Sequence, residues 1–144
     1  MIRNDVLCSG AIIPQPDLVN IYGCEIGEGT KVAAFVEIGT GVVIGRNCKI
    51  EAFAFIPYGV TIEDDVFIGP HVCFTNDKYP PSGKITRTHV KRGAAIGAGA
   101  VIVCGVTIGE RAKIGAGAVL LRNVADDEVV VGYAAQGLAE SRWK

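Results

Sequence analysis

Large apolar residues recur at every sixth position over most of the chain. The series runs from Ile26 to Phe74 without a polar member and resumes at Val90, four positions out of phase. Its other members are Val32, Ile38, Ile44, Ile50, Ile56, Ile62, Ile68, Ile96, Ile102, Ile108, Ile114 and Leu120. A small or β-branched residue precedes most of them by two positions, and this alternation is typical of a strand with both residues facing inward. We therefore expect one short strand in each six-residue unit.

Turn-forming residues often stand three positions after the large residue, as at Gly41, Asn47 and Asn123. Glycine, asparagine and aspartate tolerate positive φ angles. A helix cannot share the period, because six residues advance it by about 600° and the large residue would wander around its axis. Residues 96–101 are echoed by residues 114–119, eighteen positions later, which indicates three units per coil. The pattern predicts an all-β fold, a parallel β-helix of about five coils.

The same pattern predicts a single domain over residues 1–144. It has an N-terminal lead-in (1–20), the β-helix (21–125) and a C-terminal tail (126–144), and a loop over residues 76–89 interrupts the β-helix. Pro-Pro and Ser-Gly pairs exclude a regular strand in this loop, and the next strand is displaced by ten residues. A polar loop on a rigid scaffold is typical of a functional element, and a tolerated surface insertion is the alternative.

The composition agrees with a glycine-rich β fold. Glycine supplies 19 of 144 residues, and each glycine inside a helix costs ~1 kcal/mol relative to alanine, which argues against long helices. No apolar run reaches the ~20 residues of a membrane span, and the first residues do not resemble a secretion signal. Five cysteines without a CxxC pair favour neither a disulfide framework nor a zinc site. We expect a cytoplasmic protein with reduced thiols, no metal, and neither membrane nor nucleic acid as a partner.

One corner of the predicted prism changes along the chain. Phe35, Phe53 and His71 occupy it in three coils, whereas Gly99 and Gly117 occupy it after the loop. Loss of the side chains should leave a groove above His71, in which a thin ligand such as a pantetheine arm lies on backbone amides. The alternative is that the two glycines only satisfy corner geometry.

The repeat resembles that of the hexapeptide-repeat acyltransferases over about residues 21–125. Within residues 66–80 and 90–97, Phe-Thr-Asn leads into a proline-containing loop, and this block resembles the sugar-nucleotide 3-N-acetyltransferase branch. The resemblance implies a left-handed coil, a homotrimer with sites between subunits, and acetyl-CoA as the acyl donor. It also implies acetylation of a 3-amino-3-deoxy sugar on a nucleoside diphosphate, in O-antigen or other surface-polysaccharide synthesis. The tail departs from the family's Gly-x-Pro-Ala segment, because residues 131–135 contain no proline.

The resemblance assigns a role to Asn76 by position, and the chemistry of nearby residues suggests further candidates. Asn76 would accept a hydrogen bond from the sugar amine and hold its lone pair toward the thioester, so that the amine attacks directly without an acyl-enzyme. His71 is the candidate general base, with a turn histidine in left-handed geometry as the alternative. Tyr79 would stack on the nucleotide base, Asp77 would orient substrate or cap the turn, and His89 is a further candidate for substrate contact.

The cofactor candidates fall into two groups. Bare or small residues would line the pantetheine groove: Gly99, Ala100, Gly117 and Ala118. Residues 78–144 carry a net charge of +5, against −6 for residues 1–77, and this basic half suits the CoA phosphates. The candidate cations are Lys91, Arg92, Arg111, Lys113 and Arg122, each of which is otherwise a solvated surface charge.

Other functions remain open. A γ-type carbonic anhydrase uses three zinc-binding histidines on the same prism, whereas this chain has only His71 and His89, without a His-x4-His spacing. An O-acetyltransferase would need a histidine base to activate a hydroxyl group. A non-catalytic prism would bind a sugar nucleotide or act as a scaffold.

Overall fold

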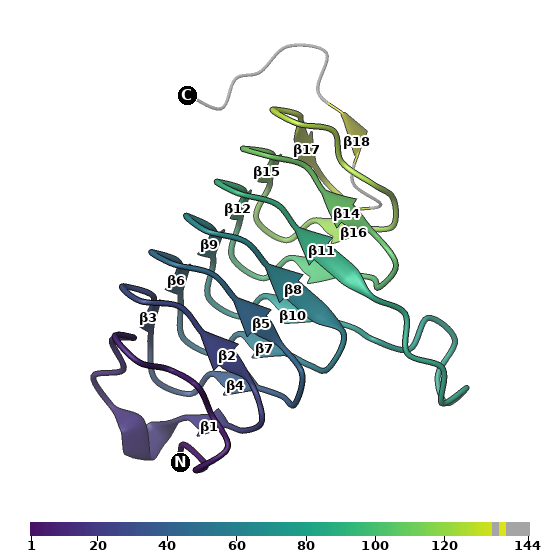
Figure 1. The fold of residues 1–144 in the computed structure, drawn as a ribbon. Helices are drawn as coiled ribbons and strands as arrows, with labels where there is room; N and C mark the ends of the chain where they lie inside the picture. Colours follow the sequence, from purple (N-terminus) through teal and green to yellow (C-terminus); the bar gives the residue numbers. More distant parts are fainter. Residues whose placement is uncertain (134–135, 138–144) are drawn as a thin grey trace.

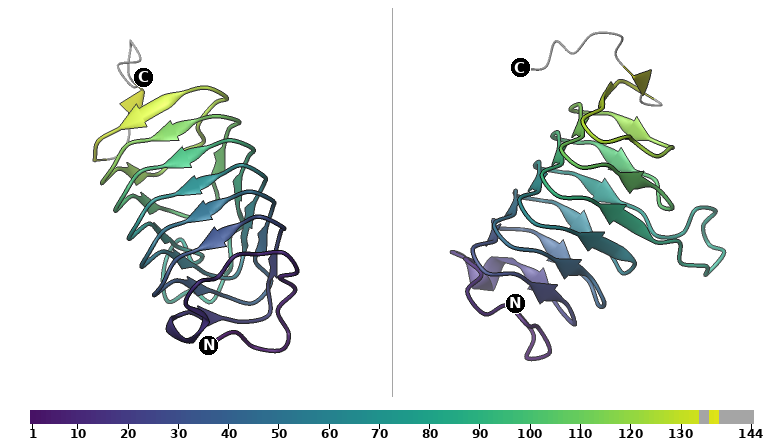
Figure 2. Two further views of the ribbon diagram at one scale, coloured as in Figure 1. Left: turned by 90° about the vertical axis from the view of Figure 1, so that its left-hand side faces the viewer. Right: turned by 45° about the horizontal axis from the view of Figure 1, so that its top comes forward.

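The chain winds into a prism with three sheet faces (Figure 1). The structure is a computed structural model that describes residues 1–133 and 136–137. Successive coils stack along one axis, so that β1 and β17 lie at opposite ends (Figure 2). These features confirm the predicted left-handed parallel β-helix.

Each sheet takes one short strand from successive coils. Sheet A comprises β1 (Asn20–Ile21), β4 (Glu37–Ile38), β7 (Phe55–Ile56), β10 (Cys73–Phe74), β13 (Val101–Ile102) and β16 (Val119–Leu120). Sheet B comprises β2 (Glu25–Ile26), β5 (Val43–Ile44), β8 (Val60–Ile62), β11 (Thr88–Val90) and β14 (Thr107–Ile108). Sheet C comprises β3 (Lys31–Val32), β6 (Lys49–Ile50), β9 (Phe67–Ile68), β12 (Ala95–Ile96), β15 (Lys113–Ile114), β17 (Val129–Val131) and β18 (Gln136–Gly137). The β17–β18 pair is antiparallel and the other pairs of these strands are parallel.

The register confirms three six-residue units per coil. Ile38 pairs with Ile56, eighteen residues further along the chain. Across the interrupting loop the offset grows by the predicted ten residues, because Ile62 pairs with Val90. The last coil is two residues short, since Ile114 pairs with Val130.

The core is a column of the large residue from every unit. Ile38, Ile68, Ile96 and Phe74 are all completely buried, and full burial of one such side chain contributes about 1.5–3 kcal/mol. The buried Thr30 keeps its hydroxyl satisfied, since it donates to the Gly45 carbonyl at 2.7 Å and accepts from the Cys48 N–H at 3.0 Å. The sequence period therefore reports the core directly.

The corners adopt left-handed backbone conformations, as predicted at Gly41 and Asn47. Four corners carry positive φ at residue types that the pattern did not mark: Phe35, Phe53, His71 and Arg111. The prediction for Asn123 was wrong, because Val124 pairs with Ile108 and the corner between Leu120 and Val124 is two residues shorter than the others; the next left-handed residue is Asp127 on the following corner, with φ of 60°. The Asn123 side chain instead accepts the Thr107 N–H at 2.8 Å.

Stacking continues beyond residues 21–125 at both ends. Near the N-terminus, Ile2, Leu7 and Ile12 form isolated parallel bridges to the first regular coil. There a 3-10 turn, η1 (Pro16–Leu18), precedes β1. At the C-terminal end, β17 continues sheet C. Within the described part of the chain, no helix has the length and apolar character that a membrane crossing requires.

Candidate functional site

The sheets meet at three edges, which we name after the sheets that they join. The A–B edge carries the loop between β10 and β11, which protrudes from the prism in Figure 1. The B–C edge is rich in charged residues. The C–A edge carries Phe35, Phe53, His71, Gly99 and Gly117 at equivalent positions of successive coils.

The first three of these residues form a stack of rings along the C–A edge. The ring centroids of Phe35 and Phe53 lie 5.0 Å apart, and those of Phe53 and His71 lie 4.7 Å apart with an interplanar angle of only 5°. Each stacked aromatic pair is worth about 0.5–1.5 kcal/mol beyond its buried area. The stack holds the plane of the exposed His71 imidazole where the row of rings ends.

Beyond His71 the edge is bare. No heavy atom lies within 4 Å of the position that a Cβ atom would take at Gly99 or Gly117. Gly69 differs, because a Cβ there would approach the Ala98 nitrogen to 2.7 Å. Positive φ does not require glycine at these corners either, since Phe53 and His71 adopt the same conformation. Corner geometry alone therefore does not explain Gly99 and Gly117.

Two backbone N–H groups on the bare part of the edge lack an intramolecular acceptor. Among the described residues, the amides of Ala98 and Ala116 make no hydrogen bond. Ala34 and Ala52, on the ring-stack part of the same edge, likewise have no acceptor among the described residues. On the B–C edge three of the equivalent N–H groups are capped by carboxylates at 2.8–2.9 Å, in the pairs Arg46–Asp64, Arg92–Glu63 and Glu110–Asp126. The bare part of the C–A edge thus offers two donors to a ligand carbonyl.

Asn76 stands at the base of the protruding loop. Its carbonyl accepts the Thr86 N–H at 2.8 Å, which closes the loop, and its side-chain amide donates to the Tyr58 carbonyl at 3.2 Å. No donor from the described part of the chain reaches the Oδ1 atom of Asn76. The side-chain carbonyl is therefore held in place and available to an amine.

Asp77 organises the loop. Its Oδ1 atom accepts the Ser82 hydroxyl at 2.6 Å and the Tyr79 N–H at 3.1 Å, while Oδ2 accepts the Gly83 N–H at 3.0 Å. The Ser82 hydroxyl and these amides hold the pKa of Asp77 below its ordinary value. These bonds agree with the turn-capping alternative for Asp77.

The loop encloses a small pocket. Its volume is about 320 Å³, and it is lined by Asp77, Lys78, Tyr79, Ser82, Lys84 and Thr86. The Tyr79 ring is 76% exposed, with the Lys78 Nζ atom 5.9 Å from its centroid. The pocket therefore presents an aromatic ring next to two ammonium groups.

His89 forms a dyad with a residue that sequence reasoning missed. Its Nε2 atom lies 2.8 Å from Oε1 of Glu63, whose Oε2 accepts the Arg92 N–H at 2.9 Å. Burial raises the pKa of Glu63, but the hydrogen bonds from Arg92 and His89 outweigh it, so the net pKa is lowered. His89 of β11 pairs with Thr61 of β8, although the loop separates them in the sequence. This shifted register places Glu63 beside His89 and is the signal that could have revealed the dyad.

The predicted cofactor residues are not gathered at one edge of a single chain. Three arginines are engaged in surface ion pairs away from the C–A edge: Arg92 with Asp64, Arg111 with Asp127, and Arg122 with Glu128. Lys91 lies on the B–C edge, and Lys113 lies on the outer face of sheet C. Ala100 and Ala118 are completely buried, so their side chains face the core.

The loop and the C–A edge flank opposite sides of sheet A. From β7 to β16 the outer face of this sheet is apolar between them, with Phe55, Cys73, Val101 and Val119 aligned on neighbouring strands, whereas β1 and β4 present Asn20 and Glu37 at the same position. Within one copy of the chain, His71 and the Asn76 loop therefore lie on different edges.

Comparison with known proteins agrees with this architecture. Residues 23–58, 41–76 and 87–122 match the family model described as bacterial transferase hexapeptide (six repeats). The chain belongs to the bacterial hexapeptide transferase family. It is 36% identical over 110 residues to a serine acetyltransferase of Buchnera aphidicola, which covers 72% of this chain and 35% of that protein.

A second relative of this hexapeptide transferase is the 2,3,4,5-tetrahydropyridine-2,6-dicarboxylate N-succinyltransferase of Methylorubrum extorquens. The two are 32% identical over 120 residues, which cover 78% of this chain and 36% of that protein. The chain thus spans little more than a third of the length of these curated relatives.

Solved structures share the fold. AntD, an N-acyltransferase from Bacillus cereus in complex with dTDP and 3-hydroxybutyryl-CoA, gives a TM-score of 0.80 at 20% identity, covering 92% of this chain and 81% of that one. The acetyltransferase domain of PglB from Neisseria gonorrhoeae, in complex with acetyl coenzyme A, gives 0.78 at 23% identity, covering 90% and 58%. At these identities the likeness establishes the hexapeptide β-helix and nothing finer.

Proposed function

We propose that this hexapeptide transferase is an acetyl-CoA-dependent N-acetyltransferase. Its acceptor is the amino group of a 3-amino-3-deoxy sugar linked to a nucleoside diphosphate, used in the cytoplasm for surface-polysaccharide (O-antigen) synthesis. The C–A edge carries the proposal, because the ring stack ends at His71 and gives way to bare glycines, whose open corners leave the neighbouring amides of Ala98 and Ala116 uncapped and uncovered. Similar structures that hold an acyl-CoA or a dTDP nucleotide support it.

The acyl donor would lie along the bare part of the C–A edge. A pantetheine arm carries two amides, and the N–H groups of Ala98 and Ala116 are donors that such amides or the thioester carbonyl can use. Lys113 projects from sheet C beside this track and makes no ion pair with any described residue, so it is our candidate for a CoA phosphate. Lys91, Arg92 and Arg122 lie further from the track and are secondary candidates.

The chemistry needs no covalent intermediate on the protein. The neutral amine attacks the thioester carbon, and the resulting oxyanion is stabilised by an edge N–H such as that of Ala98. The C–S bond then breaks, CoA leaves as the thiol after taking up a proton, and the nitrogen loses a proton to a base, which we assign to His71. Asn76 directs the nitrogen lone pair through its free side-chain carbonyl.

A complete site would require two copies of the chain. The His71 edge and the Asn76 loop lie on opposite sides of the apolar outer face of sheet A, and three copies packed around this face would bring the loop of one to the edge of the next. Burial of Phe55 and Val101 in such a homotrimer would remove exposed apolar surface from water. The trimer and the shared site are therefore parts of one proposal.

O-acetyl transfer is the second candidate. Serine acetyltransferases are among the relatives, at 36% and 34% identity, and the His89–Glu63 dyad has the geometry that activates a hydroxyl group. This reading predicts that Glu63→Gln suppresses turnover, whereas the N-acetyl reading predicts little effect.

The test is release of CoA thiol from acetyl-CoA in the presence of UDP- or dTDP-linked 3-amino sugars, with serine as the competing acceptor. We expect turnover with an amino sugar and none with serine. Asn76→Ala should reduce kcat/KM by about a hundredfold, an effect of about 2.7 kcal/mol. His71→Phe preserves the ring stack and removes only the proton acceptor, so its acidic pH–rate limb should vanish. An unaltered pH profile in that variant would exclude His71 as the base.

A further inference from the structure

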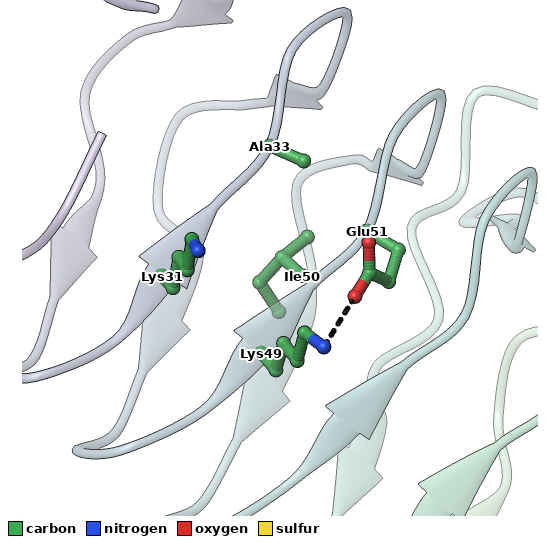
Figure 3. Close-up of a pocket in the computed structure, with 5 residues that line it drawn as sticks. All are labelled: Lys31, Ala33, Lys49, Ile50 and Glu51. Atoms are coloured by element: carbon green, nitrogen blue, oxygen red, sulfur yellow. Dashed lines mark ion pairs between the residues drawn. The ribbon is translucent and has the colours of Figure 1, made fainter. Parts of the chain in front are cut away.

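A second pocket lies in the first half of the prism, where the outer face of sheet C meets the C–A edge (Figure 3). Its volume is about 240 Å³, and it is lined by Lys31, Ala33, Lys49, Ile50 and Glu51. Lys31 and Lys49 occupy paired positions of β3 and β6, so their side chains project from neighbouring strands on one face. Lys49 forms an ion pair with Glu51 at 3.0 Å, while Lys31 has no carboxylate partner among the described residues.

The stacked rings stand next to this pocket in the sequence of each coil. Ala33 precedes Phe35 by two residues, and Glu51 precedes Phe53 by two residues. Both rings are about half exposed, at 53% and 50%. Two ammonium groups and two half-exposed aromatic rings thus belong to the same two coils, the lysines on the face of sheet C and the rings at the corner that follows it.

We propose that this pocket binds the nucleoside diphosphate of the acceptor, with the diphosphate between Lys31 and Lys49 and the base against Phe35 and Phe53. The inference rests on the proposed function, and it assigns the two ligands to different halves of the C–A edge. The acceptor nucleotide lies beside the ring stack in the first half of the prism, and the acyl donor lies along the bare glycines in the second half. The two ligands meet at His71, where the stack ends.

Glu51 provides a variant in which nucleotide affinity should increase and not decrease. Its carboxylate neutralises Lys49 in the empty pocket and would repel a diphosphate. Glu51→Gln should therefore tighten binding of the nucleotide, whereas Lys31→Ala and Lys49→Ala should weaken it. A general loss of fold would weaken binding in all three variants.

The experiment is calorimetric titration of the full chain with UDP, dTDP and, separately, CoA. We expect each lysine variant to raise the Kd for UDP or dTDP by about tenfold or more, because phosphate contacts to cations are charge-assisted, and Glu51→Gln to lower it severalfold. Phe53→Ala should weaken UDP or dTDP and leave pyrophosphate unchanged. Arg46→Ala, which removes the same charge from the B–C edge, is the matched control and should bind as the wild type does.

Three outcomes overturn the assignment. Unchanged nucleotide affinity in Lys31→Ala and Lys49→Ala would remove the pocket from the site. A loss confined to Lys78→Ala and Lys84→Ala would place the nucleotide in the loop pocket instead. A loss of CoA affinity in the Lys31 and Lys49 variants, with UDP and dTDP unaffected, would show that the pocket serves the donor. Acetyl transfer to the UDP- or dTDP-linked 3-amino sugar is measured independently by release of CoA thiol, so the proposed function can stand when this inference fails.

Discussion

Gly99→Phe should block the acyl donor while leaving the β-helix folded. Phe35 and Phe53 already occupy the equivalent corners with φ of 62° and 64°, close to the 69° of Gly99, so the backbone need not move. The left-handed conformation costs about 1–2 kcal/mol, and stacking of the new ring on His71 returns about 0.5–1.5 kcal/mol. The net loss of at most about 1.5 kcal/mol corresponds to a fall in Tm of no more than about 6 °C.

A Cβ atom at Gly99 would have no heavy atom within 4 Å, and the new ring would fill this open space. Titration with CoA should show a Kd raised by at least tenfold, equal to about 1.4 kcal/mol. Asp65→Phe places the same ring on a left-handed corner of the B–C edge, with φ of 59°, and should leave CoA binding unchanged. CoA binding of wild-type strength by a folded Gly99→Phe protein would refute the donor track.

Three further predictions concern the scaffold. Phe74→Ala removes a completely buried ring and should cost about 3–5 kcal/mol in urea unfolding; a loss below 1 kcal/mol would contradict the packing. Asp77→Ala removes three hydrogen bonds from the loop, so proteolysis at the loop should accelerate severalfold without a change in Tm, and a rate equal to that of the wild type would contradict its organising role. The lowered pKa of Glu63 contributes stability above its unfolded pKa of about 4.3. We expect that contribution to the free energy of unfolding, at most about 0.5 kcal/mol for so exposed a pair, to disappear as the pH falls through the folded pKa. Glu63→Gln should lack this acid-dependent loss of stability. The same pH dependence of unfolding in Glu63→Gln and the wild type would contradict the dyad.

The fold could be predicted from the sequence because its core is one-dimensional. Each coil buries the same kind of residue at the same position, so Ile38, Ile56 and Phe74 mark both the period and the sheet to which they belong. The ten-residue displacement at the loop could also be counted, since the strands on either side keep their inward residues.

The site was less predictable, because its contacts depend on how corners stack and not on the period. The pattern marked Asn47 and Gly41 as left-handed residues but not Phe53, and left-handed geometry at His71 was expected only as the alternative to a general base. The conformation of both residues is accompanied by ring stacking along the edge. Glu63 was missed because its partner His89 lies beyond the loop, where the register is shifted. The basic half of the chain likewise did not reveal that Arg111 is engaged by Asp127.

The most direct test of a site shared between copies is subunit mixing. Asn76→Ala has an intact C–A edge and a defective loop, and Gly99→Phe has an intact loop and a defective edge. At an acetyl-CoA concentration well below the Kd of the wild type, each variant alone should transfer acetyl to the amino sugar at no more than about a tenth of the wild-type rate. After the two are unfolded together and refolded in equal amounts, activity should rise to about a quarter of the wild-type rate, because half of the edges and half of the loops are intact and pair at random in a closed ring. A refolded mixture no more active than its components would contradict the shared site.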